Sequence, residues 1–218
     1  MIRVRKNITA PKSLSTTKKY DGEDVLRQLE EDHYKKCYLC ERHLTTDFEV
    51  EHFKSQDNNS DLRQNWNNLF WSCTYCNPKK GNRFDDILNP TKVNIEDEIR
   101  QTIAFGEKKA FFEPIKETEE HRNTCKLLLN IHNGTGRLRT KKEENFFEYM
   151  VGKMNNFYSL INQYLNNPTD YNCNLVKEKL QIDKEFLGFK YWIIKSKPQL
   201  VEVFANDIIW NKNESDCK

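Results

Sequence analysis

The sequence has 218 residues, a formal net charge of +2 and a hydrophobic content of 37%. This length allows one large domain or two small ones, and an aromatic content of 12% can supply a core, which excludes a disordered chain. A net charge this close to zero excludes binding of nucleic acid through overall basicity. Any phosphate-binding surface therefore has to come from a local concentration of basic residues.

The seven cysteines are an odd number, and three of them, Cys125, Cys173 and Cys217, are scattered along the chain. A disulfide framework is therefore not expected. The first residues lack the apolar run of a secretory signal, and no stretch approaches the length of a membrane span. These features predict a soluble protein of the reducing cytoplasm.

Residues 1–20 are predicted to form an extended, basic N-terminal arm, because Pro11 and a cluster of Ser and Thr disfavour a helix. Two interpretations remain open: a solvated tail, or an arm that contacts phosphates. No acidic residue precedes Asp21. The basic residues of the arm are Arg3, Arg5, Lys6, Lys12, Lys18 and Lys19.

Residues 21–95 are predicted to form a small mixed module. An amphipathic helix over 21–34 leads into the first cysteine, and the alternating stretch 48–53 is typical of a strand. A polar loop over 54–66 separates it from a second, apolar strand over 68–73, and a short basic helix follows from Asn77.

Residues 96–218 are predicted to be helical, after a boundary at 84–95 that contains Pro90. The clearest helix covers 142–165, where apolar residues form one stripe. Further helices are expected over 175–186 and after Pro198 through Trp210. The predicted fold class is therefore α+β, predominantly α, with a small module followed by a helical C-terminal region.

Two Cys-x-x-Cys pairs dominate the module: Cys37 with Cys40, and Cys73 with Cys76. Two such pairs complete a tetrahedron of thiolates, which predicts a structural zinc site. Because all four ligands come from the protein, this zinc keeps no open position for catalysis. The 32 residues between Cys40 and Cys73 leave room for a strand and a loop that carry polar residues. The alternative is a set of buried or redox-active thiols.

Between the pairs lies Glu51-His52. Imidazole is the natural general base near neutral pH, and an adjacent carboxylate is a hard ligand that suits Mg²⁺. Neighbouring side chains on a regular strand point to opposite faces, so both reach one site only if the strand ends or bulges there. A lone histidine beside a surface glutamate is the alternative.

Asn77 follows the second cysteine pair, and its amide oxygen could be a second ligand of the divalent ion. Asn68 could hold the loop or orient His52 through backbone hydrogen bonds. The basic residues of the module are candidate contacts to nucleic acid, and they are Lys54, Lys79, Lys80 and Arg83.

These motifs together resemble the HNH endonuclease family with its ββα-metal core. The resemblance rests on Glu51-His52, on Asn68-Leu69 and on Cys73-Thr74-Tyr75-Cys76-Asn77 with the following Lys79-Lys80-Gly81. It implies that His52 activates water, that Glu51 and Asn77 bind one Mg²⁺ or Mn²⁺ ion, and that Asn68 is structural. The chain departs from the commoner pattern with Glu in place of Asp at 51 and Asn in place of His at 77, and both variants keep oxygen ligands.

A wider resemblance covers the IRVRK opening, the Leu88-Asn89-Pro90 step and the run from Thr124 to Arg139. These segments are similar to PtuB-type and retron-associated HNH nucleases of bacterial anti-phage defence. That resemblance implies an SMC/ABC-like ATPase as protein partner and nucleic acid as substrate, for which we favour DNA over RNA. An RNase on the same core, for example one that cleaves tRNA, and a non-catalytic zinc module that binds nucleic acid or protein remain alternatives.

Overall fold

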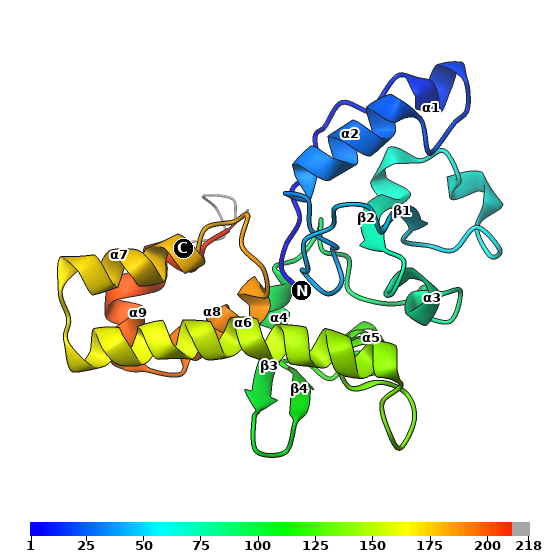
Figure 1. The fold of residues 1–218 in the computed structure, drawn as a ribbon. Helices are drawn as coiled ribbons and strands as arrows, with labels where there is room; N and C mark the ends of the chain where they lie inside the picture. The colour runs from blue at the N-terminus through cyan, green and yellow to red at the C-terminus, as the bar shows by residue number, and fades with distance from the viewer. Residues whose placement is uncertain (211–218) are drawn as a thin grey trace.

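The computed structural model describes residues 1–210, so Cys217 lies outside the described part. Figure 1 shows α1, α2, β1, β2 and α3 on one side of the long helix α6, and the β3–β4 hairpin on its other side. The mixed, predominantly helical class that the sequence predicts is confirmed. The helices are α1 (Ser13–Thr16), α2 (Glu23–Asp32), α3 (Asn77–Lys80), α4 (Ile95–Glu98), α5 (Glu119–Asn133), α6 (Lys141–Asn166), α7 (Asp170–Lys179), α8 (Leu187–Lys195) and α9 (Pro198–Phe204).

The module is built on an antiparallel hairpin of β1 (Phe48–His52) and β2 (Leu69–Cys73). The register pairs Phe48 with Cys73 and His52 with Leu69, without a bulge. Every residue of β2 is buried, because α2 packs against this strand and the aromatic side chains of Phe70 and Trp71 face protein on both sides. Helix α3 then follows the second cysteine pair, with a proline in its first turn.

The long helix α6 organises the C-terminal region. It begins at a capping box in which Thr140 and Glu143 satisfy each other's backbone N–H groups. Its buried stripe packs against α5 and α7, which confirms the helix predicted over 142–165. The buried apolar residues of the stripe are Phe146, Phe147, Met150, Met154, Phe157 and Ile161.

The helix predicted over 175–186 is displaced in the structure. Helix α7 begins at Asp170 because the Thr169 side chain caps it through the Asn172 N–H, and it ends at Lys179. The sequence did not predict α8 as a separate helix. Seven of its nine residues are buried, so it lacks the repeating polar face by which an amphipathic helix is recognised. The last predicted helix is present as α9 and a 3₁₀ turn over Ala205–Ile208.

The prediction that the chain is helical after residue 96 is wrong for residues 99–114. They form an antiparallel hairpin of β3 (Ile99–Ala104) and β4 (Lys109–Pro114). Burial alternates along β4, with Ala110 and Phe112 inside and their neighbours less buried, and over the first three residues of β3, which is the period of a strand and not of a helix. The hairpin packs against α5 and α8.

The N-terminal arm also differs from the extended arm that the sequence predicts, because Ser13–Thr16 form the short helix α1. Met1, Ile2 and Val4 are buried, and the Val4 N–H donates to the Pro90 carbonyl at 2.9 Å. The Lys6 ammonium lies over the Trp66 ring and donates to the Leu69 carbonyl at 2.6 Å. Its contacts are therefore inside the protein. Met1, Ile2 and Val4 are thus part of the core, whereas Arg5, Lys12, Lys18 and Lys19 are the exposed basic residues of the arm.

Contacts cross the boundary expected near residue 95. The Glu41 carboxylate accepts hydrogen bonds from the N–H groups of Leu187 at 2.7 Å and Gly188 at 3.0 Å. The Tyr75 hydroxyl donates to the Ile131 carbonyl at 2.7 Å. Module and helical region therefore share one core, and a functional division between them remains a proposal. Within residues 1–210, no helix is both long and apolar enough to cross a bilayer.

Candidate active site and metal centre

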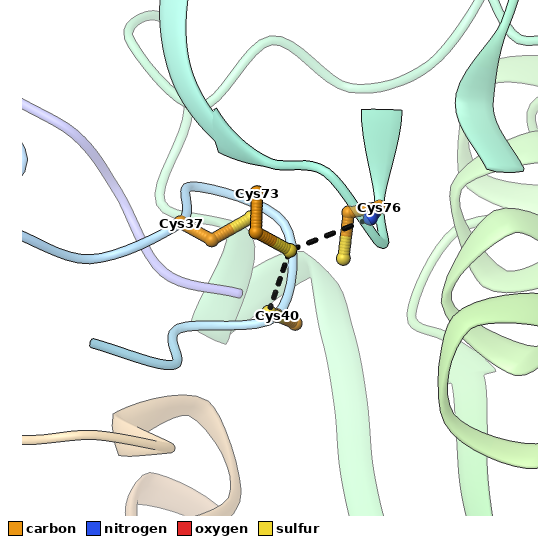
Figure 2. Close-up of side chains that lie close together, drawn as sticks. All are labelled: Cys37, Cys40, Cys73 and Cys76. Atoms are coloured by element: carbon orange, nitrogen blue, oxygen red, sulfur yellow. Dashed lines mark hydrogen bonds between the residues drawn. The ribbon is translucent and has the colours of Figure 1, made fainter. Parts of the chain in front are cut away.

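The four cysteines of the two pairs meet at one point in the core (Figure 2). Cys37 and Cys40 lie on the turn after α2, where Glu41 takes a positive φ of 60° and its N–H returns to the Cys37 carbonyl. Cys73 ends β2 and Cys76 precedes α3. The Tyr38 N–H donates to the Trp71 carbonyl at 3.0 Å and so ties the turn to the strand.

The geometry of this cluster fits a metal with four thiolate ligands. The four sulfurs lie within 4.8 Å of one another, and each cysteine is at most 1% exposed. A tetrahedron with Zn–S bonds of about 2.3 Å places its sulfurs about 3.8 Å apart, close to the 3.9 Å between Cys40 and Cys73. That separation is far beyond the roughly 2.05 Å of a disulfide. The cluster could therefore hold zinc with every ligand position filled by the protein.

Glu51 lies on the face of the hairpin that carries α3, and it is 4% exposed. One carboxylate oxygen accepts from the Tyr38 hydroxyl at 2.6 Å, and the other pairs with the Lys80 ammonium at 2.8 Å. Burial raises the pKa of Glu51, and the charge of Lys80 opposes that rise. The carboxylate is thus held in place by two partners from the cysteine turn and from α3.

Lys80 requires a correction, because we expected it among the contacts to nucleic acid. Its side chain is fully buried, and its ammonium also donates to the His52 carbonyl at 3.1 Å and lies 3.9 Å from Asp85. A lysine that serves as counter-ion to Glu51 cannot at the same time reach a phosphate in solvent.

Asn77 lies on the same side of the hairpin as Glu51. Its amide nitrogen donates to the Glu49 carboxylate at 2.7 Å, and Glu49 and Glu51 are two positions apart on β1, which places them on one face. This bond uses the amide NH₂ group and not the amide oxygen that would bind a cation. Glu51 and Asn77 are hard oxygen donors, so in kind they fit Mg²⁺ or Mn²⁺.

His52 is the last residue of β1, so the strand ends where the sequence requires it to end if His52 and Glu51 are to reach one site. Its Nε2–H donates to the Arg63 carbonyl at 3.0 Å. A carbonyl can only accept, so the lone pair of the ring lies on Nδ1, which accepts from the Gln56 amide at 3.0 Å. The Tyr20 ring packs edge-on against the imidazole at 4.8 Å between centroids.

The surroundings of His52 keep it neutral. Burial is the main cause that lowers its pKa, and the charges of Arg63 and Lys80 add to this effect. At 6% exposure the side chain is also less accessible than the surface histidine that we expected. The Nδ1 atom therefore carries an unprotonated lone pair that is oriented by its neighbours, which is the state a general base needs.

Asn68 closes the polar loop that follows β1. Its amide oxygen accepts from the Lys54 N–H at 2.7 Å, and its amide nitrogen donates to the carbonyls of Lys54 at 3.0 Å and Leu62 at 3.3 Å. The side chain thereby joins both ends of the loop that carries Arg63 and Gln56, the two partners of His52.

The remaining basic candidates differ in exposure. Arg83 is exposed, and Lys54 is partly exposed while paired with Asp86 at 2.8 Å. Lys79 pairs with Glu143 of α6 at 2.5 Å and is largely covered. Arg63, which the sequence did not single out, is exposed, and its guanidinium lies over the Tyr20 ring at 5.2 Å.

Sequence reasoning missed the residues that hold the predicted site residues in place. Tyr38 and Lys80 fix Glu51, and Gln56, Arg63 and Tyr20 surround His52. No motif marks them, because two of the His52 contacts come from an irregular loop and one from the N-terminal segment. Lys80 is the exception, because the sequence analysis did select it, but as a surface contact to nucleic acid and not as a partner of Glu51.

Comparison with known proteins supports the same module. The family model described as HNH endonuclease matches residues 37–83, which include the two cysteine pairs, Glu51-His52 and Asn77. A curated relative, the Septu protein PtuB of Bacillus thuringiensis, is 44% identical over 62 residues. That match covers 26% of this chain and 24% of the length of PtuB. The predicted resemblance to the HNH endonuclease family is thereby confirmed over residues 37–83.

Proposed function

We propose that this protein is a metal-dependent HNH endonuclease that hydrolyses phosphodiester bonds as the effector of a bacterial anti-phage defence system. The observation that carries the proposal is the neutral His52, whose Nδ1 lone pair is set by the Arg63 carbonyl inside a module that matches the HNH family. The similarity to PtuB supports the role in defence. We favour DNA over RNA as the substrate.

In this proposal His52 takes the proton of the attacking water at Nδ1. The Arg63 carbonyl holds the imidazole in the required tautomer and stabilises the charge that the ring gains. The Gln56 amide now occupies the Nδ1 lone pair, so the water has to displace it or be held by it. The exposed guanidiniums of Arg63 and Arg83 supply local positive charge for the phosphate backbone.

Glu51 and Asn77 would hold the divalent ion, Mg²⁺ or Mn²⁺, in this proposal. When bound, the ion supplies positive charge for the oxygens on phosphorus and for the leaving oxygen. Tyr38 keeps the Glu51 carboxylate in its orientation, and Lys80 balances its charge. The cysteine cluster would hold a structural zinc that fixes β2 and α3 relative to each other.

The direct test is to incubate the purified protein with duplex DNA and, separately, with total tRNA in the presence of Mg²⁺, with and without the product of its genomic neighbour. Cleavage of duplex DNA supports the proposal. Cleavage of tRNA alone establishes the RNase alternative, and metal-dependent binding without cleavage in either mixture establishes the non-catalytic zinc module.

Substitution of the two oxygen donors is expected to raise the Mg²⁺ concentration that half-maximal activity requires. Asn77→Ala is the cleaner variant, because Asn77 is half-buried and loses only its bond to Glu49. We expect an increase of tenfold or more, measured as a Mg²⁺ titration of the cleavage rate. Asn67→Ala, at an exposed asparagine of the same module, is the matched control. An unchanged titration for Asn77→Ala would remove Asn77 from the ligand set.

Glu51→Gln should act in the same direction and also lower stability. The substitution leaves the Lys80 ammonium buried beside a neutral amide, which costs about 3–5 kcal/mol for a broken buried pair. The Mg²⁺ titration of this variant therefore has to be read beside its melting temperature.

We further propose that the region after residue 96 docks onto an SMC/ABC-like ATPase that gates or delivers the substrate. Two tryptophans of this region form hydrogen bonds inside the protein: Trp192 donates to the Ile99 carbonyl and Trp210 to the Leu180 carbonyl. Several other apolar side chains of this region are exposed, among them Tyr171 at 72% and Ile115 at 51%. Exposed aromatic and aliphatic side chains are common anchors of interfaces.

Charge substitution at these positions is expected to separate the ATPase from the nuclease. In co-expression followed by size-exclusion chromatography, the unmodified full chain should elute with the ATPase, and Tyr171→Glu or Ile115→Glu should reduce the shared peak. Ile8→Glu is the control, because Ile8 is fully exposed but lies in the N-terminal segment. Loss of the complex in all three variants, or no complex with the unmodified chain, would contradict docking through the helical region.

A further inference from the structure

A basic cavity of about 380 Å³ lies among α6, α7 and α8, on the side of the helical region that meets the cysteine turn. Its walls carry four lysines from separate elements and a single acidic residue, Glu185, so the lining has a formal net charge of +3. His43, three residues after Cys40, closes the side next to the module. The basic lining residues are Lys153 of α6, Lys179 of α7, Lys184 of the following loop and Lys190 of α8.

Three of these lysines have an acidic neighbour. Lys153 pairs with Glu185 at 3.0 Å, Lys179 with Glu178 at 2.8 Å and Lys184 with Asp183 at 2.8 Å. These pairs are partly exposed, with side-chain exposures of 49%, 36% and 29% for the lysines, so water and salt weaken them and their ammonium groups can turn to a ligand.

Lys190 differs from the other three lysines. It is 5% exposed, and its ammonium donates to the Lys179 carbonyl at 2.8 Å. In the part of the chain that the structure describes, no carboxylate lies within ion-pair distance of this ammonium. Burial of a charge without an opposite charge is costly, and here it lowers the pKa of Lys190 to about 7. An anion in the cavity would compensate this cost.

The geometry points to a small phosphate-bearing molecule as the occupant of this cavity. A negatively charged ligand suits a lining of four lysines and one carboxylate, and lysines from several elements suit the several oxygens of a phosphate. A volume of about 380 Å³ is within the usual range of about 300–1,000 Å³ for small-molecule sites, which leaves room for a nucleotide. A polynucleotide backbone on the surface could not reach an ammonium that is 5% exposed.

Two residues that line the cavity, Lys184 and Glu185, are hydrogen-bonded to the nuclease module. Glu185 accepts from the His43 N–H at 2.9 Å, and the buried Lys36 donates to the Lys184 carbonyl at 2.8 Å. Lys36 and His43 flank the turn that carries Cys37 and Cys40, and they pair with each other as an isolated β-bridge. A ligand that is bound at Lys184 and Lys190 would therefore contact residues that are hydrogen-bonded to the loop that carries Cys37 and Cys40.

The test is calorimetric titration of the full chain with inorganic phosphate, with nucleoside 5′-mono- and triphosphates, and with adenosine as the phosphate-free probe. Phosphate compounds should bind and adenosine should not. Lys190→Met should weaken binding at least tenfold, whereas Lys195→Met, at an exposed lysine of the same helix, should leave the affinity unchanged. Lys184→Gln, at a partly exposed position, should weaken it as well and guards against a folding defect in the first variant.

A second measurement distinguishes a ligand-binding role of Lys190 from a purely structural one. Without ligand, Lys190→Met should melt at the same temperature as the unmodified protein or higher, because an unpaired buried charge is replaced by an apolar chain of similar length. The proposal is overturned if no phosphate compound binds, if Lys190→Met binds as tightly as the unmodified protein, or if only an oligonucleotide binds. A higher affinity for nucleotides than for inorganic phosphate would identify the nucleotide as the ligand, and equal affinity would identify the phosphate group alone.

Discussion

His52→Ala is expected to lower the rate of phosphodiester cleavage by about 10²–10⁴-fold, the usual contribution of a general base. The structure explains why no neighbour can take over. Because Nε2–H donates to the Arg63 carbonyl, the ring's lone pair is at Nδ1. The other neighbours of the imidazole are the Gln56 amide and the Tyr20 ring. Neither a neutral amide nor a phenol hydroxyl is basic enough to accept a proton from water.

The same substitution also has a structural cost. His52 is 6% exposed and makes two hydrogen bonds, so we expect the free energy of unfolding to fall by about 1–2 kcal/mol. Loss of activity therefore needs a control that loses similar packing at a distance from the site.

His33→Ala is that control. His33 is 3% exposed, donates its Nδ1–H to the Leu29 carbonyl at 2.8 Å and packs edge-on against the Phe70 ring. The two variants should lose comparable stability, measured by thermal unfolding, while only His52→Ala loses cleavage, measured at a temperature at which both are folded. If His52→Ala keeps the turnover of the unmodified protein, or if His33→Ala loses as much activity, His52 is not the general base.

The sequence was most informative where chemistry depends on residue type and spacing. Two Cys-x-x-Cys pairs predict a tetrahedral thiolate cluster, and the sulfurs of Cys37, Cys40, Cys73 and Cys76 do converge. The alternation in Phe48–His52 predicts a strand, and the structure places β1 there. The same alternation predicts that Glu51 and His52 face opposite sides, and the strand does end at His52 without a bulge.

What the sequence could not provide are partners that come from far along the chain. Lys80 belongs to a basic run that suggests a surface, and only the fold shows that it is buried against Glu51. The first residues of the chain look like a polar arm, because their apolar members are separated by Arg3, Arg5 and Lys6. The structure buries Met1, Ile2 and Val4 in the shared core.

The β3–β4 hairpin escaped prediction for a related reason. Its strands carry charged residues such as Arg100, Lys109 and Glu113 on the exposed face, so the composition resembles the acidic and basic segments on either side. The two strands are short, and their alternating pattern has too few apolar positions to be recognised beside the apolar stripe of the 26-residue helix α6. Tertiary packing against α5 and α8, and not local preference, selects the hairpin.

Cys73→Ser is expected to abolish metal binding and to unfold or aggregate the protein. Structural zinc contributes about 10–16 kcal/mol of apparent binding free energy in zinc-finger peptides, which is comparable to or greater than the roughly 5–15 kcal/mol that stabilises a whole domain. The four cysteines join the turn after α2, the end of β2 and the start of α3, so loss of the metal releases all three. Metal analysis of the unmodified protein should give one zinc ion per chain.

Cys173→Ser is the matched control, because Cys173 is half-buried on α7 and outside the cluster. It should keep the zinc content and the melting temperature of the unmodified protein. Treatment of the unmodified chain with a chelator should reproduce the effect of Cys73→Ser, with loss of cooperative unfolding as the readout. A protein that is free of zinc and still unfolds cooperatively at an unchanged temperature would show that packing alone, through Leu39, Phe70 and Trp71, holds the cysteine turn against β2.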